Sequence, residues 1–233
     1  MRDDTDVYPS GYKSFKRAFA GSMRGAARLH GFRFTSGEVW RIEKGFVGAC
    51  TTIPCWEKMA IHTNPGIKAL ESDGVAWDVL RMSSNRRERE SLHVTAAFSG
   101  PWLPLDAFPL KEDVPFGSEG DAPAVAEMIA SSMAECLERA LSAIGTQRRF
   151  FELVRERCER EAREEGRDPA GFGYCVALIA LGRVREARAV AAPTAARGSQ
   201  RDLFTYGVGD KGDATLIVEY CDRLLAGEGE GHE

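Results

Sequence analysis

The sequence has no long hydrophobic run. No stretch approaches the roughly 20 apolar residues that a membrane-spanning helix needs. The N-terminus, MRDDTDVYPSGYK, is acidic and polar, and it lacks the apolar segment that follows the basic start of a secretory signal. We therefore expect a cytoplasmic protein that does not act in a membrane.

Cysteine is scarce, with six residues in a chain of 233. This fraction is too small for a disulfide scaffold. Four of the six fall on the apolar stripes of predicted helices, where a free thiol behaves as a small hydrophobic side chain. Free cysteines used in this way are typical of a reducing cytoplasm.

The common catalytic signatures are also absent. The chain has no G-x-S-x-G, no H-E-x-x-H, no Walker loop and no EF-hand ligand pattern. These absences remove the most recognisable hydrolase, zinc-protease, nucleotidase and calcium-binding classes. They favour a non-catalytic protein with no cofactor, which binds another protein or a small ligand.

What is present is an ordinary globular composition, with 43% hydrophobic and 28% charged residues and a net charge of −4. Residues 1–100 are net positive and the remainder is net negative. Arginine greatly outnumbers lysine, which is typical of a GC-rich bacterial genome. The length suits one large domain or two small ones.

Hydrophobic periodicity predicts an amphipathic helix over residues 10–30, followed by short extended segments. Without a crossover helix between the first three segments, these should pair as an antiparallel meander. The sequence GVAWDVLRM at 74–82 favours a short helix. The predicted strands are GEVWRIEKG, FVGACTTIPC, KMAIHTNPGI and, at 92–100, LHVTAAFSG.

Residues 106–121 are rich in proline and glycine and form the predicted connection between two halves. Helical periodicity then continues to residue 226, with a helix break at Gly182, an end at Pro193 and a last helix over 213–225. Strands grouped before helices predict an α+β protein. Its predicted parts are an N-terminal helix packed on an antiparallel sheet (1–105), the connection (106–121), a helical extension (122–226) and a disordered tail (227–233).

One cofactor-like motif, G-x-G-x-x-G, occurs at Gly207, Gly209 and Gly212. A dinucleotide site needs a buried strand before this motif and a second strand about 20 residues after it. The preceding LFTY is short, no second strand follows, and Asp210 and Asp213 would repel a pyrophosphate. We predict instead a turn that leads into a helix capped by one of these aspartates.

Two cysteines and two histidines raise the question of a zinc site or a cysteine nucleophile. Cys50, Cys55, His62 and His93 are suitable zinc ligand types, but a separation of five residues is poor for a zinc knuckle. No metal site is therefore expected. A hydrolase or transferase that uses Cys50 or Cys55 with His62 as base is an alternative to the binding function.

A second alternative is nucleic-acid binding. The first helix carries five basic residues, and Arg86, Arg87 and Arg89 form another basic cluster that Glu88 and Glu90 interrupt. For the leading hypothesis, the predicted binding surface is the sheet face and the cleft between sheet and helices. Its candidate ligand-binding residues are Trp40, Trp56, His62, Asn64 and Trp77.

The segment VALIALGRVREARAVA resembles a helical hairpin of the tetratricopeptide type, with Gly182 at its turn. It occurs once, whereas such units stack in about three copies. We expect two helices packed on their neighbours, with a groove that could hold a peptide.

The first half of the chain resembles the bacterial family called domain of unknown function 4304, over residues 11–105. The resemblance implies a helix followed by an antiparallel sheet, and it implies no particular activity. It rests on short motifs: LHGF at 29–32, VWR at 39–41, IHTNPGI at 61–67, AWD at 76–78 and AAF at 96–98.

Overall fold

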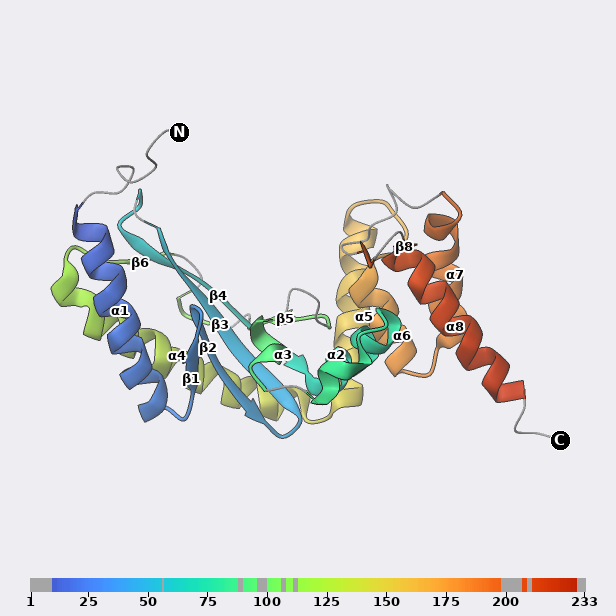
Figure 1. Cartoon of the computed structure of the whole chain (residues 1–233), viewed down its shortest axis with the longest axis horizontal. Helices are drawn as coiled ribbons and strands as arrows, with labels where there is room; N and C mark the ends of the chain where they lie inside the picture. Colours follow the sequence, from blue (N-terminus) through green and yellow to red (C-terminus); the bar gives the residue numbers. More distant parts are fainter. Residues whose placement is uncertain are drawn as a thin grey trace. The chain divides into compact units, whose positions relative to one another are not determined.

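The computed structural model describes residues 10–55, 57–87, 90–95, 100–105, 108–110, 113–197, 207–208 and 211–229. The predicted α+β class is confirmed: an N-terminal helix packs on an antiparallel sheet, and a helical region follows (Figure 1). Among these residues, no helix combines the length and apolar character needed to cross a membrane.

The chain divides into two compact units, and the division differs from the predicted one. Unit 1 combines the chain up to Ile67 with Pro104–Ala143. Unit 2 combines Lys68–Leu103 with the chain from Ile144 onward. The chain therefore passes between the units three times, whereas the sequence suggested a single crossing at 106–121.

The sheet of unit 1 begins with two tight hairpins, and three further strands extend it. Its strand order is β1-β2-β3-β4-β5, and β6 also pairs with β4. Both two-residue hairpin loops, Ser36-Gly37 and Lys44-Gly45, have positive φ at each residue. That is the turn type whose twist matches paired strands. The strands are β1 (Arg33–Thr35), β2 (Glu38–Glu43), β3 (Phe46–Cys55), β4 (Ala60–Ala69), β5 (Leu103–Pro104) and β6 (Val114–Pro115).

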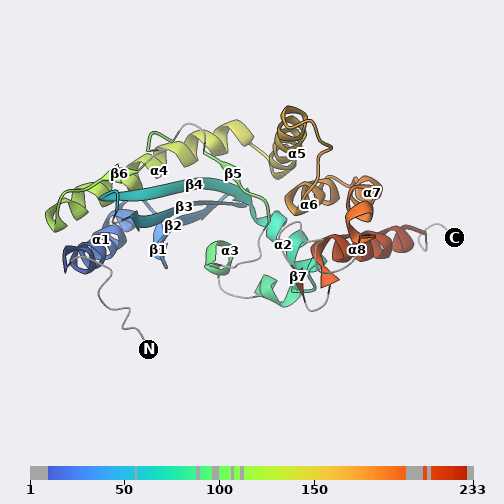
Figure 2. The same ribbon diagram turned by 90° about the horizontal axis from the view of Figure 1, so that it is seen from above.

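Two helices pack on this sheet, α1 (Ser10–Leu29) and α4 (Ala122–Ile144), and Figure 2 shows α4 running along one side of it. The apolar side of α1, with Phe15, Phe19 and Met23, is buried, and the ring of Phe15 stacks on Phe116 with centroids 3.6 Å apart. A Cβ at Gly48 would lie 2.5 Å from Leu137 Cδ1. The absence of that atom lets α4 pack closely on β3, so α4 belongs to the sheet unit and not to the helical extension.

Unit 2 is a helical cluster around one apolar core, to which α2 contributes Ala76 and Val79, and its C-cap residue contributes Leu80. Gly182, with φ of 77°, ends α6, and the two hydrogen bonds of a Schellman motif close that end (Gly182 N to Ile179 O, 2.9 Å; Arg183 N to Leu178 O, 2.8 Å). The helices are α2 (Leu70–Val79), α3 (Leu92–Thr95), α5 (Gln147–Glu164), α6 (Phe172–Ala180), α7 (Val184–Ala195) and α8 (Asp213–Gly229).

The predicted helix within 74–82 and the predicted hairpin turn at Gly182 are confirmed, but three other predictions are wrong. The tail predicted as disordered from residue 227 is helical up to Gly229, the end of α8. Leu92–Thr95 is helical, not extended, and residues 96–99 of that predicted strand lie outside the described residues. Helix α7 continues past Pro193 to Ala195. A proline so close to the helix end removes only one hydrogen bond of the last turn, and α7 packs along α8.

Short elements complete the description. Two short 3₁₀ helices are present: η2 (Ser83–Arg87) follows α2, and η3 (Glu119–Asp121) precedes α4. The strands β7 (Gly207–Val208) and β8 (Lys211–Gly212) form a small antiparallel pair. Helix α8 begins directly after this pair at Asp213, which confirms the prediction that the glycine-rich turn leads into the last helix.

Candidate functional site

Of the five residues predicted to bind a ligand, the four that the structure describes do not form one surface. Trp40 is 2% exposed in the core of unit 1, and Trp77 is 1% exposed in unit 2. His62 and Asn64 are exposed and lie two residues apart on β4, so they share one face of that strand. Trp56 lies outside the described residues. The two buried indoles serve as core, and among the four described candidates only His62 and Asn64 are accessible together.

The cysteine chemistry considered for unit 1 is not favoured by the environment of Cys50. The Cys50 side chain is buried and its Sγ lies 3.6 Å from the carbonyl oxygen of Thr51. Burial, reinforced by the charge of Glu38, raises the pKa of Cys50 to about 12. This thiol keeps its proton at neutral pH and is a poor nucleophile.

The basic cluster after α2 is partly neutralised. Arg86 makes a two-pronged contact with Asp78, Nη2 to Oδ2 and Nε to Oδ1 at 3.2 Å. Partial burial favours the neutral Asp78 carboxyl, but hydrogen bonds from Arg86 and Ser83 outweigh burial and hold its pKa below the ordinary value. Arg86 is therefore engaged within unit 2, and Glu88 and Arg89 lie outside the described residues.

The tetratricopeptide-like hairpin borders a shallow hollow of about 440 Å³. Five consecutive residues, from Gly182 in the α6–α7 turn to Glu186 in α7, line it together with Leu225 of α8. Two of them, Arg183 and Glu186, pair with each other at 2.5 Å. This hollow is the described counterpart of the groove expected at the hairpin.

The most distinctive polar feature of the described residues is a cluster of Lys68, Asp73 and His93 in unit 2, which we call the buried cluster. Lys68 Nζ lies 2.7 Å from each carboxylate oxygen of Asp73. His93 Nδ1 lies 2.5 Å from Asp73 Oδ2. The Lys68 and Asp73 side chains are fully buried, while that of His93 is 20% exposed.

Local structure explains how these three residues meet. Lys68 is the second-last residue of β4, and Asp73 lies in the first turn of α2, which starts one residue after the strand ends. A carboxylate in that turn is favoured by the helix dipole. His93 comes from α3, and its ring packs on Trp77 of α2 with centroids 5.0 Å apart.

The segment that begins at Gly100 closes over the cluster. The Gly100 N–H donates to Asp73 Oδ1 at 2.8 Å, and the ring of Trp102 lies 4.7 Å from Lys68 Nζ. A Cβ at Gly100 would lie 2.3 Å from the hydroxyl oxygen of Ser72 and 2.6 Å from its backbone carbon. Only glycine allows the backbone to approach Asp73 this closely.

Burial sets the chemistry of this cluster. Desolvation lowers the pKa of Lys68, and the neighbouring charge and hydrogen bonds of Asp73 oppose that effect. Because the Asp73 carboxylate accepts a hydrogen bond at Nδ1 of His93, the neutral imidazole carries its proton on Nδ1. Nε2 of this tautomer is then a hydrogen-bond acceptor. It belongs to His93, the one partly exposed side chain of the buried cluster.

A second cluster of the same three residue types lies in unit 1, and we call it the exposed cluster. Asp113 accepts hydrogen bonds from Lys58 Nζ at 2.8 Å (Oδ2), and its Oδ1 lies 3.2 Å from His62 Nδ1. The side chains of Lys58 and His62 are 64% and 52% exposed. Solvent surrounds these groups, so their pairing is screened and weak.

Sequence reasoning considered His93 only as a zinc ligand and did not single out Lys68 or Asp73. The available signal was the lone lysine in the otherwise apolar stretch PGIKAL, because lysine is rarely buried without a partner. In the described part of the chain, no three Cys, His, Asp or Glu side chains lie close enough together to hold a metal ion. Comparisons with family models, curated proteins and solved structures found no match.

Proposed function

We propose that this protein is a non-catalytic binding protein that holds a small polar molecule at His93. The observation that supports this proposal is the fixed imidazole. Asp73 binds Nδ1, Trp77 packs on the ring, and Nε2 remains as an oriented acceptor on a partly exposed side chain.

The chemistry of the cluster defines the ligand class. When the imidazole is neutral, its oriented Nε2 accepts a hydrogen bond from a hydroxyl or amino group. Lys68 and Asp73 balance each other's charge beneath it, so the cluster does not demand a charged ligand. The expected ligand is therefore a small molecule with a hydroxyl or amino donor.

A binding function is better supported than a hydrolase or transferase that uses Cys50. The reactive form of a cysteine is the thiolate, whereas burial keeps Cys50 protonated. His62, the expected base, is paired with Asp113 instead. We also propose a cytoplasmic location, supported by the free cysteines of the structure, and cell fractionation tests it.

The binding proposal is tested by NMR of the histidine rings. Long-range proton–nitrogen spectra are recorded on ¹⁵N-labelled protein while glucose, adenosine and ethanolamine are added one at a time. We expect at least one of the three to shift Nε2 of His93 and to leave His62, the internal control, unchanged. Binding of the same compound, measured by calorimetry, should be lost in His93→Gln, because this variant has no ring nitrogen to accept the hydrogen bond.

Two results would contradict the proposal. One is a His93 ring that none of the three compounds perturbs. The other is a His62 ring that moves in step with His93, because that would indicate a general solvent effect and not a site.

A further inference from the structure

Helix α1 carries a set of basic side chains without any acidic residue. The sequence of the helix is SGYKSFKRAFAGSMRGAARL, and every basic side chain in it is exposed. No hydrogen bond or ion pair joins them to any part of the chain that the structure describes. We call this set the basic stripe; its members are Lys13, Lys16, Arg17, Arg24 and Arg28.

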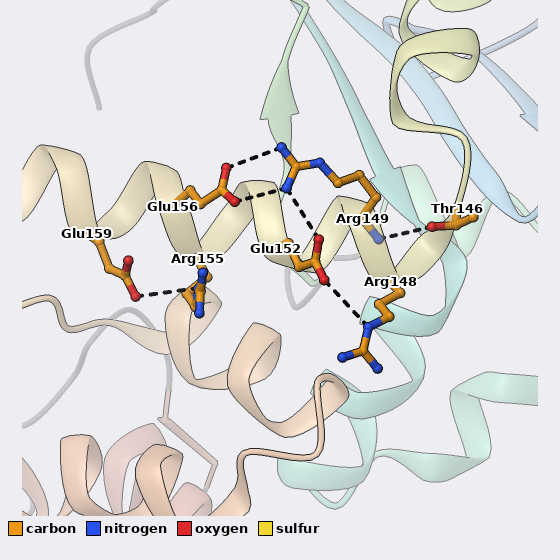
Figure 3. A network of polar contacts seen from close by, with 7 residues as sticks. All are labelled: Thr146, Arg148, Arg149, Glu152, Arg155, Glu156 and Glu159. Carbon is orange, nitrogen blue, oxygen red and sulfur yellow. Dashed lines mark hydrogen bonds and ion pairs between the residues drawn. The ribbon is translucent and has the colours of Figure 1, made fainter.

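Helix α5 shows what the same residue types do when they are internally neutralised. Figure 3 shows Arg148 and Arg149 both reaching Glu152, and Arg149 also reaching Glu156. Arg155 pairs with Glu159 in the next turn, at 3.5 Å. These arginines of α5 thus have carboxylate partners within the helix, whereas the basic side chains of α1 face solvent.

The basic stripe has a defined shape. At 100° per residue its five members fall within an arc of about 120°, and at 1.5 Å per residue it runs about 22 Å from Lys13 to Arg28. The opposite side of α1 carries Phe15, Phe19 and Met23, which are at most 2% exposed. Because that apolar side is already buried, α1 cannot insert into a lipid bilayer through it.

Neighbouring carboxylates have partners of their own. Glu127 Oε1 lies 2.6 Å from His30 Nε2, just after α1. Asp121, in η3 beside α1, accepts hydrogen bonds from the backbone N–H groups of Gly117 and Ser118, and these bonds hold its pKa below the ordinary value. Neither carboxylate is directed to the basic stripe.

The composition of the stripe indicates the partner. Protein interfaces centre on aromatic and large apolar anchors, and the stripe contains none. Ala20 lies within the same arc, and just beside the arc a Cβ at Gly21 would have nothing within 4 Å. A surface with five cations and only small side chains between them matches a line of phosphates. Arginine binds a phosphate with two parallel hydrogen bonds.

We propose that the basic stripe of α1 binds the phosphate backbone of duplex nucleic acid without sequence specificity. Single strands are bound by stacking on aromatic side chains, and the stripe has no aromatic member. The proposal is independent of the ligand site at His93, which lies in the other unit.

Fluorescence anisotropy of the full chain with a labelled mixed-sequence DNA duplex tests this proposal. With up to five phosphates neutralised, the plot of log affinity against log salt should have a slope of no more than about 4.5 in magnitude. The variant Arg17→Gln, Arg24→Gln, Arg28→Gln should lower that magnitude by about 3, close to one per lost phosphate contact.

The matched control removes three positive charges from α5 instead, as Arg148→Gln, Arg149→Gln, Arg157→Gln. It should keep the wild-type slope. Three results would overturn the proposal. These are no binding at low salt, an equal loss in both triple variants, or tighter binding of polyglutamate than of the duplex. The last result would assign the stripe to an acidic protein.

Discussion

The protein contains two clusters with the same three residue types and the same connectivity, and they differ in burial. In each, an aspartate joins the Nζ of a lysine to the Nδ1 of a histidine. In the exposed cluster the lysine and aspartate side chains are 64% and 24% exposed, and in the buried cluster both are 0% exposed. The two clusters therefore have the same residue types and differ in how far solvent reaches them.

The comparison teaches that burial can reverse the effect of a salt bridge on its own members. Hydrogen bonding to Asp113, with its charge, raises the pKa of Lys58. Desolvation lowers the pKa of Lys68 although Asp73 lies just as close. In water the carboxylate partner has the larger effect on the pKa of the lysine, and in the protein interior the loss of hydration has the larger effect.

The largest expected difference comes from removing the aspartate. Asp73→Asn should lower the free energy of unfolding by about 3–5 kcal/mol, because it leaves the charge of Lys68 buried without a counter-ion. Asp113→Asn should change stability little, because Lys58 then returns to water. Urea unfolding of both variants measures the contrast. Equal effects would show that burial does not separate the two clusters.

A smaller effect is expected from the glycine that closes the buried cluster. Gly100→Ala should destabilise the protein by about 1–3 kcal/mol, because the new Cβ overlaps Ser72, including its backbone. Gly117→Ala is the matched control, since Gly117 also donates its N–H to an aspartate but in an exposed turn with a 3.4 Å clearance. Thermal unfolding compares them, and a Gly100→Ala protein as stable as the control would contradict the prediction.

The smallest and most diagnostic effect is on pH dependence. An unfolded lysine loses its proton near pH 10.4. Folded Lys68 loses it at lower pH, so the unfolded chain binds more protons in that window and the Lys68 contribution to stability rises with pH up to about 10.4. Folded Lys58 keeps its proton longer, so its contribution is lost as pH rises above about 10.4.

The measurement is the difference in unfolding free energy between wild type and Lys68→Met, and separately Lys58→Met, between about pH 8 and pH 11. Using the difference removes the titration of the other lysines and of the tyrosines. Slopes of the same sign for the two lysines would show that their pKa values shift in the same direction.

Much of the fold could be predicted because it depends on local patterns. The apolar period of Phe15, Phe19 and Met23 identified α1, and Gly182 marked the end of α6. The resemblance to domain of unknown function 4304 stays a prediction. Strand prediction failed at Leu92–Thr95, where tertiary contacts of His93 with Asp73 and Trp77 outweigh β-branched composition.

The candidate site could not be predicted, because its members are brought together by packing and not by spacing. Lys68 and Asp73 are five residues apart, but His93 and Gly100 join them only when the chain folds back on α2. The tryptophans were misleading for a related reason. Amphipathic indoles suit binding sites and cores equally, and Trp40 and Trp77 are in cores.

The threefold passage of the chain between the units has a genetic consequence. A fragment ending at residue 105 would lack Leu137, which fills the hollow at Gly48. A fragment starting at residue 122 would lack Ala76 and Leu80, which belong to the core of the C-terminal helices. Neither unit is encoded by one continuous stretch of the gene, so neither can be duplicated, exchanged or lost by a single recombination event.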